Sequence, residues 1–310
     1  MRCLVTGTAG FVGFHVARRL LAEGHVVLGV DGMVPYYDVN LKRNRHALLE
    51  NSKQFSKREC MLEDAPAIEA VFRDFKPQRV IHLAAQAGVR HSLEHPRSYV
   101  DSNLIGSFNI LDQCRHSPPE HLVMASTSSV YGASKDFPLS EMAAANHPLT
   151  LYSASKKAME AMGHCYAHVW KLPVTVFRFF SAYGPWGRPD MAMFKFVESI
   201  LADRPIDVYN HGKMQRDWTY IDDLVESIIR LTATVPEMGK SVGETDTLSP
   251  VAPFRVVNIG GGRPEQLMDF IEEVERAIGR KAVRNYLGMQ TGDVERSEAS
   301  TRLLDPCHLC

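Results

Sequence analysis

Tyr152 and Lys156 are the two side chains in this sequence whose types and spacing best fit proton transfer. They stand four residues apart in the segment YSASK, so a helix would place both on one face. An ammonium beside a phenol, aided by any further cation close by, stabilises the phenolate and lowers a pKa that is normally about 10. Tyr152 could then exchange a proton with a substrate hydroxyl at neutral pH. Pairs with this spacing are also common on helix surfaces by chance, so further signals are needed.

Four consecutive hydroxyl side chains, Ser126 to Ser129, form a second group with chemical potential. They follow an apolar run and precede Val130, which indicates the end of a buried strand. A cluster of this kind can simply make a turn. At the carboxyl end of a parallel sheet, however, it would lie where ligands bind in open α/β folds.

Glycines three residues apart, Gly7, Gly10 and Gly13, mark a third group. They lie between an expected strand and an expected helix, where glycine permits a tight turn and close approach of the backbone to a pyrophosphate. The N–H groups that begin the helix would then face the phosphates. Asp31 ends the next expected strand. Its carboxylate can accept hydrogen bonds from both adenosine ribose hydroxyls and would repel a 2′-phosphate, so the pattern favours NAD over NADP.

Apolar strands alternate with amphipathic helices in the first half of the chain, which predicts an α/β fold. We expect a Rossmann-like doubly wound parallel sheet over residues 1–182, with returning segments at about 218–234 and 254–260, and a smaller C-terminal substrate-binding subdomain over 183–310. The expected strands are residues 2–6, 25–30, 79–84, 121–126, 174–180, 206–209 and 255–259. The expected helices are residues 11–23, 65–75, 99–115, 153–170, 194–201 and 221–232, and residues 236–253 are expected to form a surface loop.

The bulk composition excludes several classes of function. The 310 residues carry 35 Lys and Arg against 36 Asp and Glu, so no overall positive field would attract nucleic acid. No apolar run is long enough to cross a membrane, and the strand expected at the N-terminus leaves no room for a signal peptide. Six scattered cysteines are typical of reduced thiols and predict a cytoplasmic protein. We predict no metal site, although Cys307, His308 and Cys310 could form half of one.

The glycine turn, the acid at the second strand, the hydroxyl cluster and the YSASK segment occur together in this order. In that combination the chain resembles the extended short-chain dehydrogenase/reductases over at least residues 1–232, and segments 82–90 (HLAAQAGVR) and 101–103 (DSN) match them further. The resemblance implies that Thr127 assists Tyr152 and Lys156 at the substrate hydroxyl. The NAD-binding residues that it implies are Gly7, Gly10, Phe11, Val12, Gly13, Asp31, Leu62, Leu83, Ala84, Ala85, Asn103, Tyr152, Lys156 and Tyr183.

Within these enzymes the chain is most similar to UDP-glucuronate 4-epimerases. The likeness rests on residues 178–191 (RFFSAYGPWGRPDM), 36–39 (YYDV), 215–223 (QRDWTYIDD) and 85–90 (AQAGVR). It implies that UDP-glucuronate is converted to UDP-galacturonate with NAD, through a 4-keto sugar, with the cofactor regenerated. The implied substrate-binding residues, whose cations would face the diphosphate and the carboxylate, are Arg90, Ser128, Ser129, Ser181, Arg188, Tyr209, Arg216 and Asp293.

Three departures from that family pattern fall in the expected binding regions. Met61 stands where an aspartate usually holds the adenine amino group, and Ser181 replaces a threonine. After the turn at 292–294 (GDV), the usual proline-threonine-aspartate continuation is replaced by ERSEAS. We therefore expect residues 295–310 to be poorly ordered or loosely packed, and to matter little for substrate binding.

Alternative functions remain open within and outside this enzyme class. The segment 127–129 carries no carboxylate, unlike that of related 4,6-dehydratases and uronate decarboxylases, so an elimination has no obvious acid/base group. A 4-epimerase for UDP-glucose or a UDP-N-acetylhexosamine is the first alternative. A non-catalytic NAD-binding regulatory protein is the second, although such proteins usually lack the Tyr/Lys pair. The helices expected at 99–115 and 153–170 could form the intermolecular bundle of similar enzymes, so we expect a homodimer.

Overall fold

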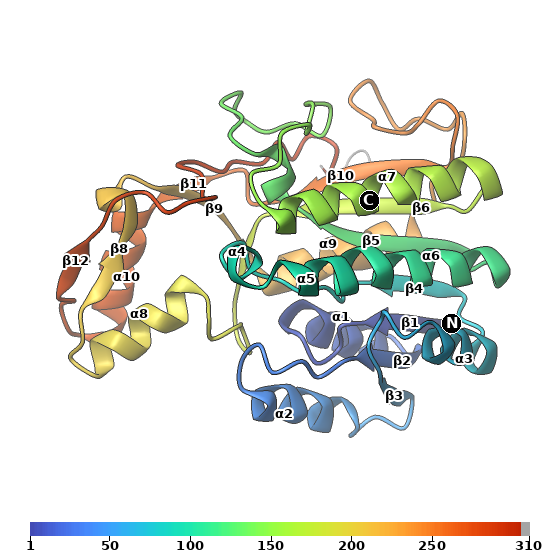
Figure 1. Ribbon diagram of the computed structural model, residues 1–310, viewed down its shortest axis with the longest axis horizontal. Coiled ribbons are helices and arrows are strands. Elements are labelled where there is room, and N and C mark those ends of the chain that lie inside the picture. Colours follow the sequence, from blue (N-terminus) through green and yellow to red (C-terminus); the bar gives the residue numbers. More distant parts are fainter. Residues whose placement is uncertain (305–310) are drawn as a thin grey trace.

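A seven-stranded parallel sheet forms the centre of the computed structural model, which describes residues 1–304 (Figure 1). Its strand order is β10-β6-β5-β4-β1-β2-β3. The order in which the chain adds strands therefore reverses at the β4–β1 pair, although all the strands are parallel. Such a reversal is the point at which doubly wound sheets bind ligands. The strands are β1 (Arg2–Thr6), β2 (Val26–Asp31), β3 (Phe55–Glu59), β4 (Arg79–His82), β5 (His121–Thr127), β6 (Val174–Phe179) and β10 (Phe254–Ile259). The predicted fold class is confirmed.

Helices cover both faces of this sheet, because its inner strands are apolar on both sides. All seven residues of β5, for example, are buried. Helices α1 (Phe11–Ala22) and α9 (Ile221–Ala233) pack on one face, and α3 (Ala65–Phe75), α6 (Gly106–His116) and α7 (Leu151–Trp170) pack on the other.

The start of α7 is fixed by a reciprocal pair of hydrogen bonds. Thr150 Oγ1 accepts from the backbone N–H of Ser153, and Ser153 Oγ accepts from that of Thr150. This capping box satisfies N–H groups that the first helical turn would otherwise leave without partners. It also sets Tyr152 as the second residue of the helix, at the end nearest the ligand edge of the sheet.

Several elements differ from the sequence-based expectation. Helices α2 (Val39–Leu49) and α10 (Leu267–Ile278) and the edge strand β3 were not predicted. The buried residues of α2 include Lys42, Arg45 and His46, so this helix lacks the apolar stripe from which helices are inferred. The helix expected over 99–115 is instead α4 (His91–Glu94), α5 (Pro96–Tyr99), a π-helical turn η1 (Val100–Ile105) and α6 in succession.

A smaller module lies beyond the carboxyl ends of the main strands (Figure 1). It contains α8 (Ala192–Leu201) and α10, the paired strands β8 (Ile206–Val208) and β12 (Arg284–Tyr286), and a second sheet of β7 (Ser181–Tyr183), β9 (Gln215–Tyr220) and β11 (Pro264–Gln266). Two short helical turns, η2 (Ser128–Tyr131) and η3 (Tyr209–Gly212), complete the elements. Segments α9 and β10 return to the main sheet, and residues 234–253 contain no helix or strand. The boundary predicted at residue 182 falls inside β7 and stays a prediction.

The segment 295–304 is well packed, so the expectation of a loose tail was wrong for these residues. Leu139 donates to the carbonyl of Glu298 and accepts from the N–H of Ser300, at 2.8 and 2.9 Å. The buried carboxylate of Asp217 accepts from the N–H of Ala299 at 2.8 Å, and Leu303 is 1% exposed. An extended segment with these backbone partners needs no apolar helical stripe, which is the feature that the expectation relied on. Residues Cys307, His308 and Cys310 lie outside the described residues.

Two further observations bear on the sequence-based exclusions. None of the helices within residues 1–304 combines the length and the apolar character needed to span a membrane. The cysteines in the same range, Cys3, Cys60, Cys114 and Cys165, are all unpaired.

Candidate active site

A pocket of about 440 Å³ opens at the carboxyl edge of the main sheet and extends to residues of the smaller module. Most residues that the sequence predicted for the site lie on its wall. They are Gly7, Gly10, Phe11, Val12, Gly13, Asp31, Leu62, Leu83, Ala84, Ala85, Thr127, Ser128, Ser129, Tyr152, Ser181, Arg188, Arg216 and Asp293. The structure therefore brings three separate sequence patterns, the glycine turn, the hydroxyl cluster and the YSASK tyrosine, to one cavity.

The glycine turn has no room for larger residues. Gly7 has a φ of +82°, and a Cβ atom there would lie 2.9 Å from the backbone nitrogen of Ala84. A Cβ atom on Gly13 would lie 2.0 Å from the carbonyl oxygen of Gly7. Helix α1 then begins at Phe11 without a side-chain cap, so the N–H groups of its first turn remain open to an anion. This cradle fits the pyrophosphate of a dinucleotide.

Asp31 lies at the end of β2, buried in the pocket wall beside the glycine turn. Its Oδ2 accepts from the N–H of Ala9 at 3.0 Å and its Oδ1 accepts from that of Met33 at 2.9 Å. These two bonds fix the carboxylate while leaving further lone pairs for ribose hydroxyls. Lys42 also lines the pocket, but its ammonium is already bound to the carbonyl of Val34 at 2.6 Å.

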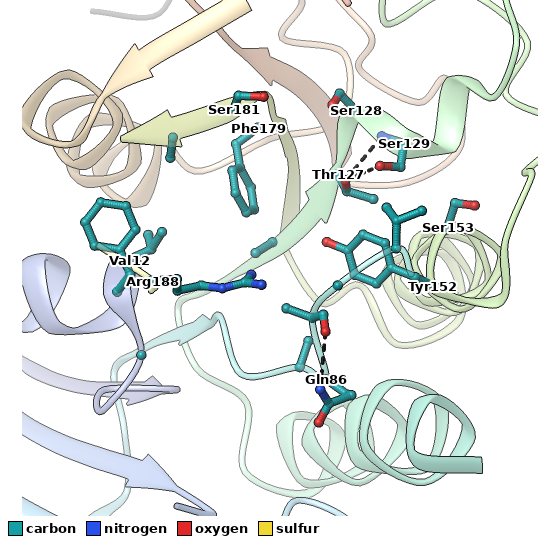
Figure 2. A pocket seen from close by; sticks show the side chains of 18 of the residues that line it. Val12, Gln86, Thr127, Ser128, Ser129, Tyr152, Ser153, Phe179, Ser181 and Arg188 are labelled. Atoms are coloured by element: carbon teal, nitrogen blue, oxygen red, sulfur yellow. Dashed lines mark hydrogen bonds between the residues drawn. The ribbon is translucent and has the colours of Figure 1, made fainter. Parts of the chain in front are cut away.

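Tyr152 projects into the pocket from the first turn of α7, with its ring facing the guanidinium of Arg188 (Figure 2). Burial raises the pKa of the Tyr152 phenol, while the Thr127 hydroxyl and the charge of Arg188 act in the opposite direction. Burial outweighs them, so the shift is opposite to the one expected from the Tyr–Lys spacing. Lowering this pKa in catalysis requires a further positive charge on the ligand side of the phenol.

Lys156 and Asn103 lie behind the pocket wall. The Lys156 ammonium donates to the carbonyl of Ala125, a wall residue, at 2.8 Å. The Asn103 amide accepts from the N–H of Gln86 at 2.8 Å and donates to Ser155 Oγ at 3.0 Å. Neither side chain lines the pocket, and each holds a wall residue in position.

The hydroxyl cluster ends β5 and begins the helical turn η2. Thr127 Oγ1 accepts from the N–H of Ser129 and donates to its hydroxyl, each at 3.2 Å (Figure 2). Ser128 and Ser129 also line the pocket, and Ser181 lines it from β7. Hydroxyl groups from three elements thus line the same pocket as Tyr152, where they could bind a carboxylate or sugar hydroxyls.

Asp190 and Tyr36, which sequence reasoning did not assign to the site, hold Arg188 in place. Asp190 accepts from both Nε and Nη2 of Arg188, at 3.0 and 2.5 Å, and from the Tyr36 hydroxyl at 3.0 Å. Burial disfavours the charge on Arg188, but Asp190 more than offsets it and raises the pKa of the guanidinium. Arg188 is therefore a fixed cation in the pocket, suited to an anionic group of a ligand.

The remaining predicted substrate residues are arranged differently from the expectation. Arg216 and Asp293 line the pocket but pair with each other, at 2.8 Å. Arg90 and Tyr209 do not line it; the Arg90 guanidinium stacks over the Tyr209 ring at 4.8 Å. Tyr183, predicted to contact the cofactor, is 37% exposed and also lies off the wall. Its ring packs in an aromatic cluster with Trp218 and Tyr220.

Two arginines that sequence reasoning missed contribute to the site. Arg45 is fully buried and donates to the carbonyls of Ala9 and Trp186, at 2.7 and 2.6 Å, which ties the glycine turn to the loop that carries Arg188. Arg296 lines the pocket, stacked over Phe137 and paired with Glu298. No pattern in α2 pointed to Arg45, whereas the departure from the family pattern at residues 295–300 was a signal for Arg296.

Known proteins with sequences similar to this chain include UDP-sugar epimerases. The profile of the NAD dependent epimerase/dehydratase family matches residues 3–244. A probable UDP-glucuronate 4-epimerase of Rhizobium meliloti is 58% identical over 308 residues, which span 98% of this chain and 90% of that protein. UDP-glucuronate 4-epimerase 3 of Arabidopsis thaliana is 43% identical and is matched over 96% of this chain and 69% of its own length.

Solved structures with the same fold include nucleotide-sugar epimerases. The UDP-glucuronic acid 4-epimerase of Bacillus cereus, in complex with UDP-glucuronic acid and NAD, has a TM-score of 0.88 at 29% identity, covering 99% of this chain and 93% of that one. The UDP-glucose 4-epimerase of Thermus thermophilus, in complex with NAD, has a TM-score of 0.82 at 29% identity, covering 98% and 92%.

Proposed function

The chain belongs to the NAD dependent epimerase/dehydratase family, and from that premise we propose that it interconverts UDP-glucuronate and UDP-galacturonate. The observation that carries this proposal is the position of Arg188, a fixed cation that faces Tyr152 across a pocket ringed by hydroxyl groups. The C5 carboxylate of a uronate would give that cation an anionic partner in addition to Asp190, which a neutral hexose cannot do. The 58% identity to a probable UDP-glucuronate 4-epimerase points to the same substrate.

NAD is the cofactor that the glycine turn and Asp31 would hold. The pyrophosphate would bind at the first turn of α1, and the ribose hydroxyls would donate to the Asp31 carboxylate. Bound there, NAD supplies a reversible hydride acceptor for C4 of the sugar. Its positive ring would also provide the charge that the buried Tyr152 phenol lacks in the chain alone.

The chain's own residues move the proton and hold the sugar. Tyr152 would accept the proton of the C4 hydroxyl at its phenolic oxygen and return it to the C4 oxygen, once the 4-keto sugar has turned and C4 has taken the hydride back on its opposite face. The Thr127 hydroxyl lies against the phenol and would bind the same sugar oxygen. Lys156 would act from one helical turn beyond Tyr152, keeping a positive charge on the same helix and fixing the strand end through Ala125.

Retention of the carboxylate distinguishes epimerisation from decarboxylation of a 4-keto uronate. Arg188 and the hydroxyls of Ser128, Ser129 and Ser181 would bind the carboxylate on several sides. A carboxylate in such contacts is stabilised as the anion, which disfavours loss of CO₂. No carboxylate side chain stands in the segment 127–129 to assist an elimination.

An incubation of the purified protein with UDP-glucuronate, without added NAD, tests the proposal directly. We expect UDP-galacturonate to appear, and the Tyr152→Phe variant to be slower by at least about a hundredfold while it still binds NAD. UDP-glucose and UDP-N-acetylglucosamine are the comparison substrates. Faster epimerisation of either one would show a different substrate class. No epimerisation of any of the three, even after NAD is added, would contradict an epimerase function.

We also propose that the protein is a cytoplasmic homodimer. Helices α6 and α7 pack side by side and, with the turn before α6, carry exposed apolar side chains, among them Phe108 at 46% and Val169 at 55% exposure. Ile105 and Trp170 are exposed on the same elements, and a second copy of this chain would cover these side chains. Light scattering should give twice the mass of the chain, and Phe108→Glu should give the monomer mass. The unpaired thiols favour a reducing compartment.

A further inference from the structure

Three side chains that can ligate a metal converge at the short helix α4, next to the pocket. They are His91, Glu94 and His95, and one ligand atom from each lies within 4.8 Å of the others. In the segment HSLEH the histidines are four residues apart and the glutamate is three residues after the first of them. A single helical turn therefore directs all three to one side. This spacing was not noticed in the sequence, from which we predicted no metal site.

The three side chains are available to a ligand. None of them has a hydrogen bond or an ion pair with another residue in the part of the chain that the structure describes. The backbone that carries them is nevertheless well fixed: the N–H of His95 donates to the carbonyl of His91 at 2.8 Å. The two imidazole rings lie 4.4 Å apart, and that of His91 also packs against Tyr36 at 4.8 Å.

We propose that His91, Glu94 and His95 bind one divalent transition-metal ion such as Zn²⁺ or Ni²⁺. Two imidazole nitrogens and one carboxylate oxygen are a donor set that suits these ions, with the remaining coordination positions left to water. Mg²⁺ and Ca²⁺ prefer oxygen ligands alone and are disfavoured. Because Glu94 and His95 are exposed, the affinity should be on the order of 1–100 µM, weaker than that of a closed structural zinc site.

The same spacing occurs in one class of metalloprotease, but the geometry here points to binding alone. In H-x-x-E-H proteases the glutamate acts on a water molecule and a further residue completes the metal site. Here Glu94 is itself one of the three converging ligands, and α4 has only four residues. The ion would lie outside the pocket wall, behind Tyr36, so it has no direct part in the chemistry proposed for Tyr152.

A Ni²⁺ titration of the untagged protein, followed by calorimetry, tests this site. Ni²⁺ is chosen because imidazole binds it well, which limits interference from the free thiols. The titration is made in a background with Cys307→Ser, His308→Asn and Cys310→Ser, because those residues could bind metal themselves. We expect one site, with affinity reduced at least tenfold by His91→Asn or His95→Asn and about threefold by Glu94→Gln.

His116→Asn is the matched control. His116 is an exposed histidine four residues after a carboxylate, Asp112, but within residues 1–304 it belongs to no group of three metal-ligating side chains. It should leave the Ni²⁺ affinity unchanged, and turnover of His95→Asn without metal should stay within twofold of the parent. Equal loss in His116→Asn and His95→Asn would mean non-specific binding and overturn the site. So would unchanged affinity in His91→Asn and His95→Asn. The titration measures binding only, so its outcome is independent of whether the chain is an epimerase.

Discussion

The Lys156 ammonium lies 2.8 Å from the backbone carbonyl of Ala125, the residue two positions before the strand-end Thr127. This bond joins the helix that carries Tyr152 to the strand that carries the hydroxyl cluster. Burial lowers the pKa of Lys156 to about 8, while the negative charge of Glu160, one turn further along α7, acts in the opposite direction. The charge on Lys156 is therefore sensitive to pH close to the physiological range.

Turnover should fall as the pH rises through about 8, because Lys156 is an ammonium below its pKa and neutral above it. A neutral amine no longer stabilises the phenolate of Tyr152, so the rate of the proton step drops. Measurement of kcat between pH 6 and 10 checks this, with Lys156→Met as the control that removes the charge at every pH. A profile that stays flat to pH 9.5 would show that the charge of Lys156 is not required.

Asp31 should make the protein select NAD over NADP by more than about tenfold, which corresponds to about 1.4 kcal/mol. The reason is repulsion between its carboxylate, held by the N–H groups of Ala9 and Met33, and a 2′-phosphate. In Asp31→Asn the amide oxygen can replace one of these bonds but the charge is gone, so the preference should shrink to about threefold or less. Fluorescence titration with both reduced cofactors measures it, and equal affinities in the parent protein would contradict the assignment.

Arg188→Ala should reduce kcat/KM for UDP-glucuronate at least about tenfold more than that for UDP-glucose, because only the former has a carboxylate to pair with the guanidinium. Arg216→Ala is the control. Its guanidinium pairs with Asp293 on another part of the wall, so both substrates should suffer alike. If Arg188→Ala affects both substrates equally, this residue binds the diphosphate or holds the loop instead.

Arg296 should contribute to binding of any UDP-sugar. It lines the pocket beside Ser297, and its buried Nε has no hydrogen-bond partner among the described residues, although Nη2 pairs with Glu298. Arg296→Ala should raise KM about threefold to tenfold with little change in kcat, as expected when uniform binding is lost. Arg296→Lys keeps the charge and should recover part of the loss. A lower kcat at unchanged KM would place Arg296 near the chemistry instead.

The predictable part of this site follows from local patterns at the ends of strands. The glycine turn, Asp31 and the hydroxyl cluster each depend on a strand followed by a helix or turn, and all three line the pocket in the structure. The Arg45 bridge and the Asp190 clamp on Arg188 could not be found in this way. Arg45 joins segments more than 100 residues apart, and Asp190 binds both a near neighbour and Tyr36 across the fold. Such contacts depend on tertiary packing that no periodicity reports.

The segment 295–304 shows why the absence of an apolar helical stripe wrongly predicted loose packing. Residues 295–300 lack an apolar periodicity, yet their backbone is bound on both sides. Asp217 accepts from the N–H of Ala299 and also from those of Gly261 and Gly262, so one buried carboxylate fastens two segments. The sequence shows Asp217 only as a part of QRDWTYIDD, without its distant partners.

Deleting residues 297–310 should therefore destabilise the protein, contrary to what the sequence alone suggested. The deletion removes the buried Leu303, worth about 1.5–3 kcal/mol, and leaves the Asp217 carboxylate with an unmet buried acceptor at a cost of about 1–3 kcal/mol. We expect a melting temperature lower by several degrees, together with a KM for UDP-glucuronate raised more than fivefold, because Ser297 lines the pocket. Deleting residues 305–310 only is the matched control, because it spares all of these contacts; the longer deletion should lower the melting temperature and raise KM relative to it. If the longer deletion left both quantities unchanged, the contacts of Ala299 and Leu303 would contribute little to folding or to the site.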